Sequence, residues 1–240
     1  MLDYSFDWSV LWRHPYGAML IDGVFTTLKL SLAAWLIAVG LGLLMGTLRV
    51  QPVRWLRIVG SVYVQIFRNT PLLLHLFFWY FAAPLLLPKT LQQELYDKVP
   101  NYAFWASVVG LGAYTASRVG EQVRSGFRAV PKSQYWAAYA SGLTTIQAYR
   151  HVVLPYALRI VVPSLTTEFL TCFKNSALAM TIGVMEITHT AYYIDAFTWR
   201  GLETTTAASL AYLSICGLII GIMTLVEQKT RIPGLSGRRR

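Results

Sequence analysis

The sequence predicts an all-α, polytopic membrane protein with five membrane-spanning helices and one folded cytoplasmic loop. Three observations lead to this fold class. The 240 residues are 55% apolar and only 13% charged, whereas soluble domains carry about 25% charged residues. The charges are clustered and leave long uncharged stretches between them. Five of these stretches approach the length of about 20 apolar residues that a helix needs to cross a bilayer.

The predicted spans cover residues 24–48, 71–88, 102–117, 160–187 and 204–226. In the first span, Gly42 and Gly46 are one helical turn apart, a spacing that favours close contact with another helix. The second contains a titratable His75, and Pro84 and Pro88 should end it. The fourth is unusually polar for a span.

Lys and Arg residues predict the orientation, because cytoplasmic loops of membrane proteins carry an excess of them. Fifteen of the 21 Lys and Arg residues lie in the loop 49–70, in the loop 118–159 or in the tail. In a five-span chain these three regions share one side of the membrane. We therefore expect an extracytoplasmic N-terminal segment (1–21), a membrane domain (22–228) and a basic cytoplasmic tail (229–240).

Several function classes do not fit the sequence. The net charge of +10 does not indicate a nucleic-acid partner, because the basic residues flank apolar segments and form no stripe on a soluble face. No G-x-x-x-x-G-K-[ST] phosphate loop is present, so we expect no ATP hydrolysis by this chain. Cys172 and Cys216 lie in apolar runs without metal-site spacing. We expect no catalysis, metal ion or cofactor on this chain.

The loop 118–159 is predicted to fold into a compact knob (residues 135–155). Its Ala-rich stretch 136–140 favours a short helix, and Gly142 permits a sharp bend after it. A second short helix should run over residues 144–153. Pro155 should help to end this helix, because proline disfavours helical backbone in the residue before it.

The knob resembles the coupling loop of permease subunits in ATP-binding-cassette importers. That family's pattern is E-A-A, three residues, G, nine residues, I-x-L-P. The corresponding positions here are Trp136, Ala137, Ala138, Gly142, Val152, Leu154 and Pro155. Tryptophan thus replaces the glutamate, which removes one charged contact with the ATPase, and valine replaces the isoleucine conservatively. The resemblance implies that these residues couple the chain to an ATPase.

Further segments resemble permeases for polar amino acids. Residues 67–72 are similar to the F-R-x-x-P-L segment that opens the second span in that subfamily, and residues 174–184 are similar to its K-N-S/T…I-G-V/L segment. Residues 118–124 and 226–229 most resemble the glutamate/aspartate branch. The similarity extends over residues 22–233, nearly the whole chain.

The resemblance implies a permease subunit of the bacterial cytoplasmic (inner) membrane, with the N-terminus outside and the C-terminus inside. It implies a second permease subunit, homologous or identical, two ATPase subunits that hold ATP and Mg²⁺, an extracytoplasmic amino-acid-binding protein, and surrounding membrane lipid. The substrate it implies is glutamate or aspartate. Alternatives are a permease for basic amino acids or glutamine, a self-sufficient ion-coupled carrier or channel, and a membrane-anchored scaffold without transport.

The polar residues of the fourth span are candidates for the substrate path. Ionisable groups at the centre of a span cost about 2.5–3.5 kcal/mol each, so they usually face other helices or a wet path. Residues six positions apart, such as Glu168 and Lys174, lie about 120° apart on a regular helix. They should therefore not pair with each other. Either each meets a partner elsewhere, or the helix is broken near Asn175.

Two interpretations of Lys174 remain open. It attracts the carboxylates of an amino acid, or it lies near a helix end and extends to the membrane interface. Arg118, at the end of the third span, is expected to fix the topology. His75 is more often a packed histidine than a ligand in such a setting. The candidate path residues are Glu168, Lys174, Asn175, Ser176 and His75.

Overall fold

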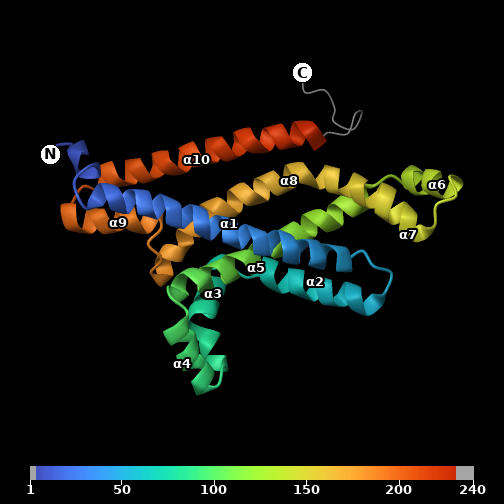
Figure 1. Cartoon of the computed structure of the whole chain (residues 1–240), viewed down its shortest axis with the longest axis horizontal. Helices are drawn as coiled ribbons and strands as arrows, with labels where there is room; N and C mark the ends of the chain where they lie inside the picture. Colours follow the sequence, from blue (N-terminus) through green and yellow to red (C-terminus); the bar gives the residue numbers. More distant parts are fainter. Residues whose placement is uncertain (1–3, 231–240) are drawn as a thin grey trace.

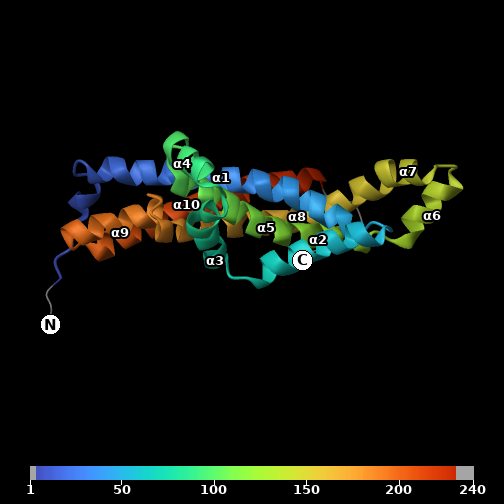
Figure 2. The same cartoon turned by 90° about the horizontal axis from the view of Figure 1, so that it is seen from below.

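The computed structural model describes residues 4–230, and side chains up to residue 228. All regular elements of this part of the chain are helical, which confirms the all-α class. The long helices α1 (Tyr16–Leu48), α5 (Tyr102–Ala129), α8 (Leu154–Asn175) and α10 (Gly201–Thr230) run along the long axis of the molecule (Figure 1). They keep this direction when the molecule is turned by 90° (Figure 2), so together they form an elongated bundle.

Shorter helices lie at the two ends and on one side of the bundle. The turn η1 (Trp8–Leu11) and α9 (Ile187–Thr198) lie at the end that holds the N-terminus. At the opposite end, α6 (Lys132–Ala140) and α7 (Thr145–Ala148) project beyond the long helices. On the side of the bundle, α3 (Leu72–Phe77) and α4 (Lys89–Lys98) stand out near its middle (Figure 1).

Small side chains allow α1 and α5 to form the most extensive helix contact in the described chain. Ala34, Ala38, Gly42 and Gly46 recur every fourth residue on the buried face of α1. A Cβ atom added at Gly42 would lie 2.6 Å from the Cβ of Val119. The contact predicted from the glycine spacing is therefore confirmed, and it depends on the absence of side chains at these positions.

Replacing Gly42 by alanine is expected to destabilise the bundle by about 1–3 kcal/mol, the usual effect of overpacking a tight contact. The new methyl group would also lie 2.9 Å from the carbonyl oxygen of Ala116. Gly40→Ala is the matched control, because a Cβ at Gly40 meets nothing within 4 Å. Thermal unfolding in detergent measures both variants. Equal stability of the two would contradict this account of the α1–α5 contact.

The connection after the first span is a helix rather than the predicted loop. α2 (Arg54–Asn69) runs back along α1 and α5. It buries Gly60 and Val64, and the hydroxyl of Tyr63 donates to the carbonyl of Ala113 at 2.7 Å. The helix is amphipathic, so its apolar residues recur with the helical period between arginines. A search for uninterrupted apolar stretches misses this pattern.

The second predicted span, 71–88, is not one long helix, so that prediction is wrong. α3 continues through the π-helical turn η2 (Phe78–Ala82), and the 3₁₀ turn η3 (Pro84–Leu86) follows. The apolar helix Leu72–Ala82 is about 16 Å long, half of a hydrocarbon core of about 30 Å. Pro84 and Pro88 interrupt the helical pattern, as expected from the sequence.

Three helices are long and apolar enough to cross a membrane, namely Tyr16–Leu48, Thr145–Ile182 and Gly201–Gln228. They contain the predicted first, fourth and fifth spans apart from the last residues of the fourth. α5 contains the third and is 28 residues long, but its second half carries Arg118, Glu121 and Arg124. The described chain therefore supports three of the five predicted spans by length and composition.

Pro155 does not end the second short helix of the knob, contrary to the sequence prediction. α7 continues through the π-helical turn η4 (Tyr149–Val153) into α8, and Pro155 occupies the first turn of α8. The π-helical turn η4 lies directly before this proline, so the helical hydrogen-bond pattern changes where proline supplies no N–H donor. The knob is thus joined to a long helix of the bundle without a loop.

The predicted segment boundaries at the two ends of the chain stay predictions. α1 begins at Tyr16, inside the segment 1–21 that was expected to precede the membrane domain. The predicted basic tail, 229–240, lies outside the described residues apart from the end of α10.

Candidate functional site

The knob consists of α6, a turn at Gly142 and α7. Gly142 adopts φ +78°, a left-handed conformation that glycine reaches without steric cost. Its N–H donates to the carbonyl of Tyr139 at 2.9 Å, and the N–H of Leu143 donates to that of Ala138 at 3.2 Å. These two bonds form a Schellman motif, which ends α6. The predicted bend at Gly142 is confirmed.

A capping box starts the second helix of the knob. The side chain of Thr144 accepts from the backbone N–H of Gln147, and the side chain of Gln147 accepts from the backbone N–H of Thr144. Such reciprocal bonds satisfy two N–H groups that a helix start would otherwise leave without partners. The shape of the knob is therefore encoded by residues within the knob itself.

The inner side of the knob is packed onto the ends of α5 and α8. Ala138, Ala148 and Val153 are at most 4% exposed. The ring of Tyr149 stacks on that of Phe127, with centroids 5.5 Å apart. Because these contacts are apolar and extensive, a movement of the knob would be transmitted to α5 and α8.

The outer side of the knob carries large exposed apolar side chains. Trp136 is 72% exposed, Ile146 is 80% exposed and Tyr139 is 48% exposed. Exposed apolar groups gathered on a projecting element are typical of a docking surface. Of the remaining motif positions, Ala137 and Gly142 are exposed, and three are half-buried. These three are Val152, Leu154 and Pro155.

α8 presents a polar stripe on its exposed surface. Thr167 and Lys174 are exposed, and Thr171 between them is half-buried. Their spacing places the three side chains within about 60° of one another around the helix. The hydroxyl of Thr171 donates to the carbonyl of Thr167 at 2.9 Å. Polar groups in a membrane span usually face a wet path or another protein rather than lipid.

Glu168 lies on another face of α8 and pairs with Arg118 of α5. Its Oε2 lies 2.6 Å from Nε of Arg118, its Oε1 lies 3.3 Å from Nη2 of the same guanidinium, and Gln122 donates to Oε1 at 3.4 Å. The side chain of Glu168 is 6% exposed and that of Arg118 is 37% exposed. A partner elsewhere in the chain was one of the two alternatives for Glu168, but the sequence does not identify Arg118 as that partner.

The other candidate path residues lie on or near the end of α8. The α-helix ends at Asn175 and continues as the 3₁₀ helix η5 (Ser176–Ile182). This is the break near Asn175 that the sequence offers as one of two alternatives. Ser176 is buried and its hydroxyl donates to the carbonyl of Phe173 at 2.6 Å. Among the described residues, no ion pair joins Lys174 to Glu168.

His75 is a packed residue on α3, as the sequence analysis favoured. Its ring stacks on that of Phe67 with centroids 4.9 Å apart, and its Nε2 lies 3.3 Å from the carbonyl oxygen of the same residue. Tyr114 of α5 packs at a tilt against it. These contacts hold α3 against α2 and α5.

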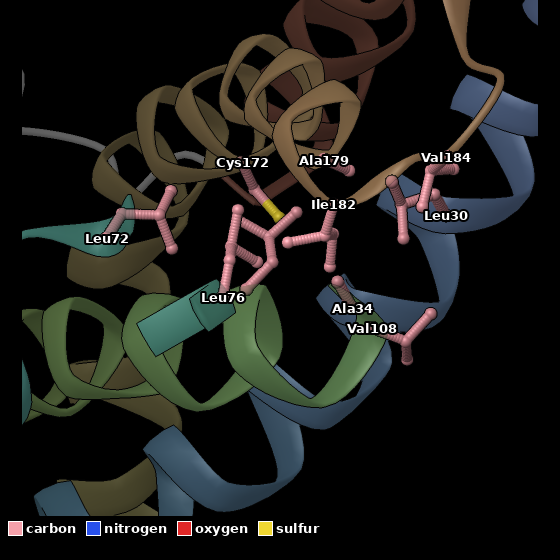
Figure 3. Close-up of a cluster of buried hydrophobic side chains, with 10 residues drawn as sticks. Leu30, Ala34, Leu72, Leu76, Val108, Cys172, Ala179, Ile182 and Val184 are labelled. Carbon is pink, nitrogen blue, oxygen red and sulfur yellow. The ribbon is translucent and has the colours of Figure 1, made fainter. Parts of the chain in front are cut away.

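A buried apolar cluster fixes the break in α8 relative to the rest of the bundle. Figure 3 shows Leu76 of α3 next to Cys172 of α8 and Ile182 of η5. Leu30 and Ala34 of α1 complete the cluster from the other side. The contacts of four separate parts of the chain thus meet where the helix changes its geometry.

Two buried carboxylates join several elements at the end of the bundle opposite the knob. Neither is among the candidate residues predicted from the sequence. Glu186 accepts from the backbone N–H of His189 at 2.7 Å, capping α9, and from the hydroxyl of Tyr212 at 2.8 Å. Glu203 accepts from the backbone N–H of Asp7 at 2.7 Å and from the hydroxyl of Tyr4. These bonds tie the N-terminal segment, α9 and α10 together.

A cavity of about 450 Å³ opens between α1, the start of α5 and the segment after η5. Its lining includes Lys29, Asn101 and Val184. It lies away from the knob, in the half of the bundle that holds the N-terminus. Within residues 4–228, His, Cys, Asp and Glu side chains form no group that could hold a metal ion.

Comparisons with known proteins point to membrane components of transport systems. Residues 38–232 match the family described as binding-protein-dependent transport system inner membrane component. The glutamate/aspartate import permease protein GltJ of Escherichia coli (strain K12) is 40% identical over 243 residues, covering 97% of this chain and 99% of that protein. The arginine transport system permease protein ArtQ of Bacillus subtilis (strain 168) is 30% identical over 217 residues, covering 90% and 94%.

Solved structures have the same fold. The crystal structure of an amino acid ABC transporter with histidines matches with a TM-score of 0.80 at 27% identity, covering 94% of this chain and 100% of that chain. An inward-facing MetNI methionine ABC transporter matches with a TM-score of 0.75 at 21% identity, covering 92% and 100%. At that identity the second likeness concerns the fold alone.

Proposed function

Because the chain belongs to the family of binding-protein-dependent transport system inner membrane components, we propose that it is the permease subunit of an ATP-driven importer whose substrates are glutamate and aspartate. The observation that carries the substrate is the 40% identity, over 97% of the chain, to a protein named as a glutamate/aspartate import permease. The observation that carries a transport path is the exposed polar stripe on α8.

Two permease subunits enclose the path in this proposal. The stripe of Thr167, Thr171 and Lys174 faces the second subunit across a wet passage, because lipid would not solvate these groups. Lys174 and Asn175 meet the carboxylates of the amino acid. Glu168, Ser176 and His75 support this surface from behind, since their side chains are buried.

The chain crosses the membrane five times in this proposal. α2 and α3 together make the second crossing and bend at Pro71, since Leu72–Ala82 alone is too short. α5 makes the third, and its last turn, which carries Arg128, reaches the cytoplasmic side. The N-terminus then lies outside, the knob and the C-terminus lie inside, and the inner membrane of a bacterium holds the chain.

The knob docks onto the ATPase subunits, which bind ATP and Mg²⁺. Closure of the ATPase dimer on ATP draws the two knobs together and opens the path outward, where the binding protein delivers the amino acid. Hydrolysis reverses the movement and releases the substrate inward. The apolar packing of Tyr149 and Val153 on α5 and α8 supports this transmission, because the knob has no flexible loop at its α8 end.

The proposal predicts ATP-dependent uptake of glutamate into proteoliposomes that contain this chain with its partner permease, ATPase and binding protein. Excess aspartate should block uptake of the radiolabelled substrate, and glutamine or arginine should not. If only arginine or glutamine blocked uptake, the substrate assignment would be wrong but the transporter class would stand. Uptake by this chain alone without ATP would indicate an ion-coupled carrier, and no uptake by the full complex would favour a scaffold.

A variant of Lys174 tests the path in the same assay. Lys174→Met should raise the KM for glutamate about tenfold, the effect of losing one charge-assisted hydrogen bond. Lys98→Met is the matched control, because Lys98 is an exposed lysine at the end of α4, outside the proposed path. Unchanged kinetics of Lys174→Met would remove Lys174 from the path.

A further inference from the structure

A cavity of about 310 Å³ lies where the α1–α2 turn meets the base of the knob. It is lined by arginines from three elements and by aromatic rings from three. These residues are Arg49, Arg57, Arg128, Phe127, Tyr135 and Tyr149. The proposed transport path does not use this cavity, which lies beside the helix ends rather than along the exposed stripe of α8.

The charges around the cavity are not balanced. Arg49 donates to Glu121 at 2.5 Å, but Arg124 and Arg68 pair with the same carboxylate. One carboxylate thus forms ion pairs with three guanidinium groups.

The other two arginines of the cavity have no carboxylate partner among the described residues. Neither Arg57 nor Arg128 forms an ion pair with an acidic residue of the described chain. Both line the cavity, and they come from α2 and from the last turn of α5. The cavity therefore has a net positive charge and attracts an anion.

Two buried polar atoms of the lining residues also lack partners. The Nε of Arg49 and the hydroxyl of Tyr149 are inaccessible to solvent and form no hydrogen bond within the described residues. The side chain of Arg49 is only 12% exposed. Buried donors without partners are rare in folded proteins. Both residues line the cavity, so these donors lie next to it.

The depth of the cavity identifies the source of such a ligand. α1 has 33 residues and is about 50 Å long, compared with about 40–45 Å for a bilayer with its headgroups. Arg49 follows the last residue of α1, so a membrane-crossing α1 places it in or just beyond the headgroup layer. Trp55, next to the turn, is 64% exposed, as is typical of aromatic side chains at the membrane interface.

We propose that this cavity binds the phosphate-bearing headgroup of an anionic phospholipid from the leaflet next to the knob. Basic pockets between membrane helices are known to hold such headgroups. The phosphate contacts the exposed guanidinium groups of Arg57 and Arg128, and Arg49 and Tyr149 line the same cavity. The lipid bridges the α1–α2 turn to the base of the knob, so it stabilises the knob in its place on the bundle.

The test measures lipid binding directly, independently of transport. The full-length chain, purified in its assembled complex, is transferred to zwitterionic nanodiscs, and phosphatidylglycerol is added in increasing amounts while thermal unfolding is followed. We expect a saturable rise in the unfolding temperature. The double variant Arg57→Gln/Arg128→Gln should need about thirtyfold more phosphatidylglycerol for the same rise. The reason is that each arginine near an anionic lipid strengthens binding about five- to sixfold.

Three controls decide the outcome. Arg54→Gln, an exposed arginine of the same helix that does not line the cavity, should respond like the unchanged chain. Arg57→Lys/Arg128→Lys keeps the charge and should retain most of the response, which guards against misfolding of the glutamine variant. Inorganic phosphate should not replace the lipid. The proposal would be overturned if added phosphatidylglycerol raised the unfolding temperature of Arg54→Gln and of the double glutamine variant equally. Full stabilisation by inorganic phosphate would overturn it as well.

Discussion

Replacing Gly142 by aspartate is expected to abolish ATP-driven uptake while leaving the chain in the membrane. The left-handed backbone at φ +78° costs an ordinary L-residue about 1–2 kcal/mol, and aspartate is among the residues that tolerate it best. A Cβ at this position meets nothing within 4 Å. The knob should therefore still fold, and the damage arises from the new charge.

The charge would lie at the turn between α6 and α7, the two helices that carry the exposed side chains of Tyr139 and Ile146. In the proposed complex this apolar surface is covered by the ATPase. A carboxylate buried there without a partner would cost several kcal/mol, enough to prevent docking. Uptake into proteoliposomes and recovery of the ATPase with the affinity-purified permease measure the two consequences.

Gly142→Asn is the matched control, because asparagine has nearly the same shape, tolerates left-handed backbone and carries no charge. It should retain most of the uptake. Equal losses in the asparagine and aspartate variants would place the cause in the backbone, and normal uptake by Gly142→Asp would contradict the docking role of the knob.

The knob was predictable from the sequence because its structure is set by neighbours in the chain. Gly142 supplies the left-handed turn, and Thr144 and Gln147 form the cap that starts the next helix. Only Pro155 was misinterpreted, since a proline in the first turn of one helix cannot be distinguished from one just after the end of another without knowing where the helix begins.

The membrane helices were predictable where apolar residues form an uninterrupted stretch. α1 and α10 meet that condition, and both were predicted. α2 does not, because arginines such as Arg57 and Arg68 separate its apolar positions. The length of the second span was overestimated, because its apolar residues continue past Pro84 whereas the helix does not.

The contacts of the candidate path were less predictable, because they join distant parts of the chain. Glu168 was recognised as a buried carboxylate in need of a partner, but the sequence offers many arginines. Only the packing of α5 against α8 selects Arg118, fifty positions away. The exposure of the Lys174 side chain likewise depends on which faces of α8 are covered by neighbouring helices, and the sequence alone does not show this.

Replacing Arg118 by leucine is expected to destabilise the bundle by about 3 kcal/mol. Removing one partner of a buried ion pair costs about 3–5 kcal/mol, because the remaining charge stays buried without compensation. The lower end applies, since the side chain of Arg118 is 37% exposed whereas that of Glu168 is 6% exposed. Arg159→Leu is the matched control on α8, because Arg159 is exposed and has no ion pair within the described chain.

The double variant Arg118→Leu/Glu168→Leu separates a structural role from a role in transport. It leaves no buried charge, so it should be more stable than Arg118→Leu alone, and the double-mutant cycle should give an interaction energy well above 0.5 kcal/mol. Thermal unfolding that is equal for Arg118→Leu and Arg159→Leu would contradict the buried pair. If the double variant recovers stability and uptake together, the pair only holds α5 against α8. If stability returns without uptake, the charges themselves take part in the movement of the two helices.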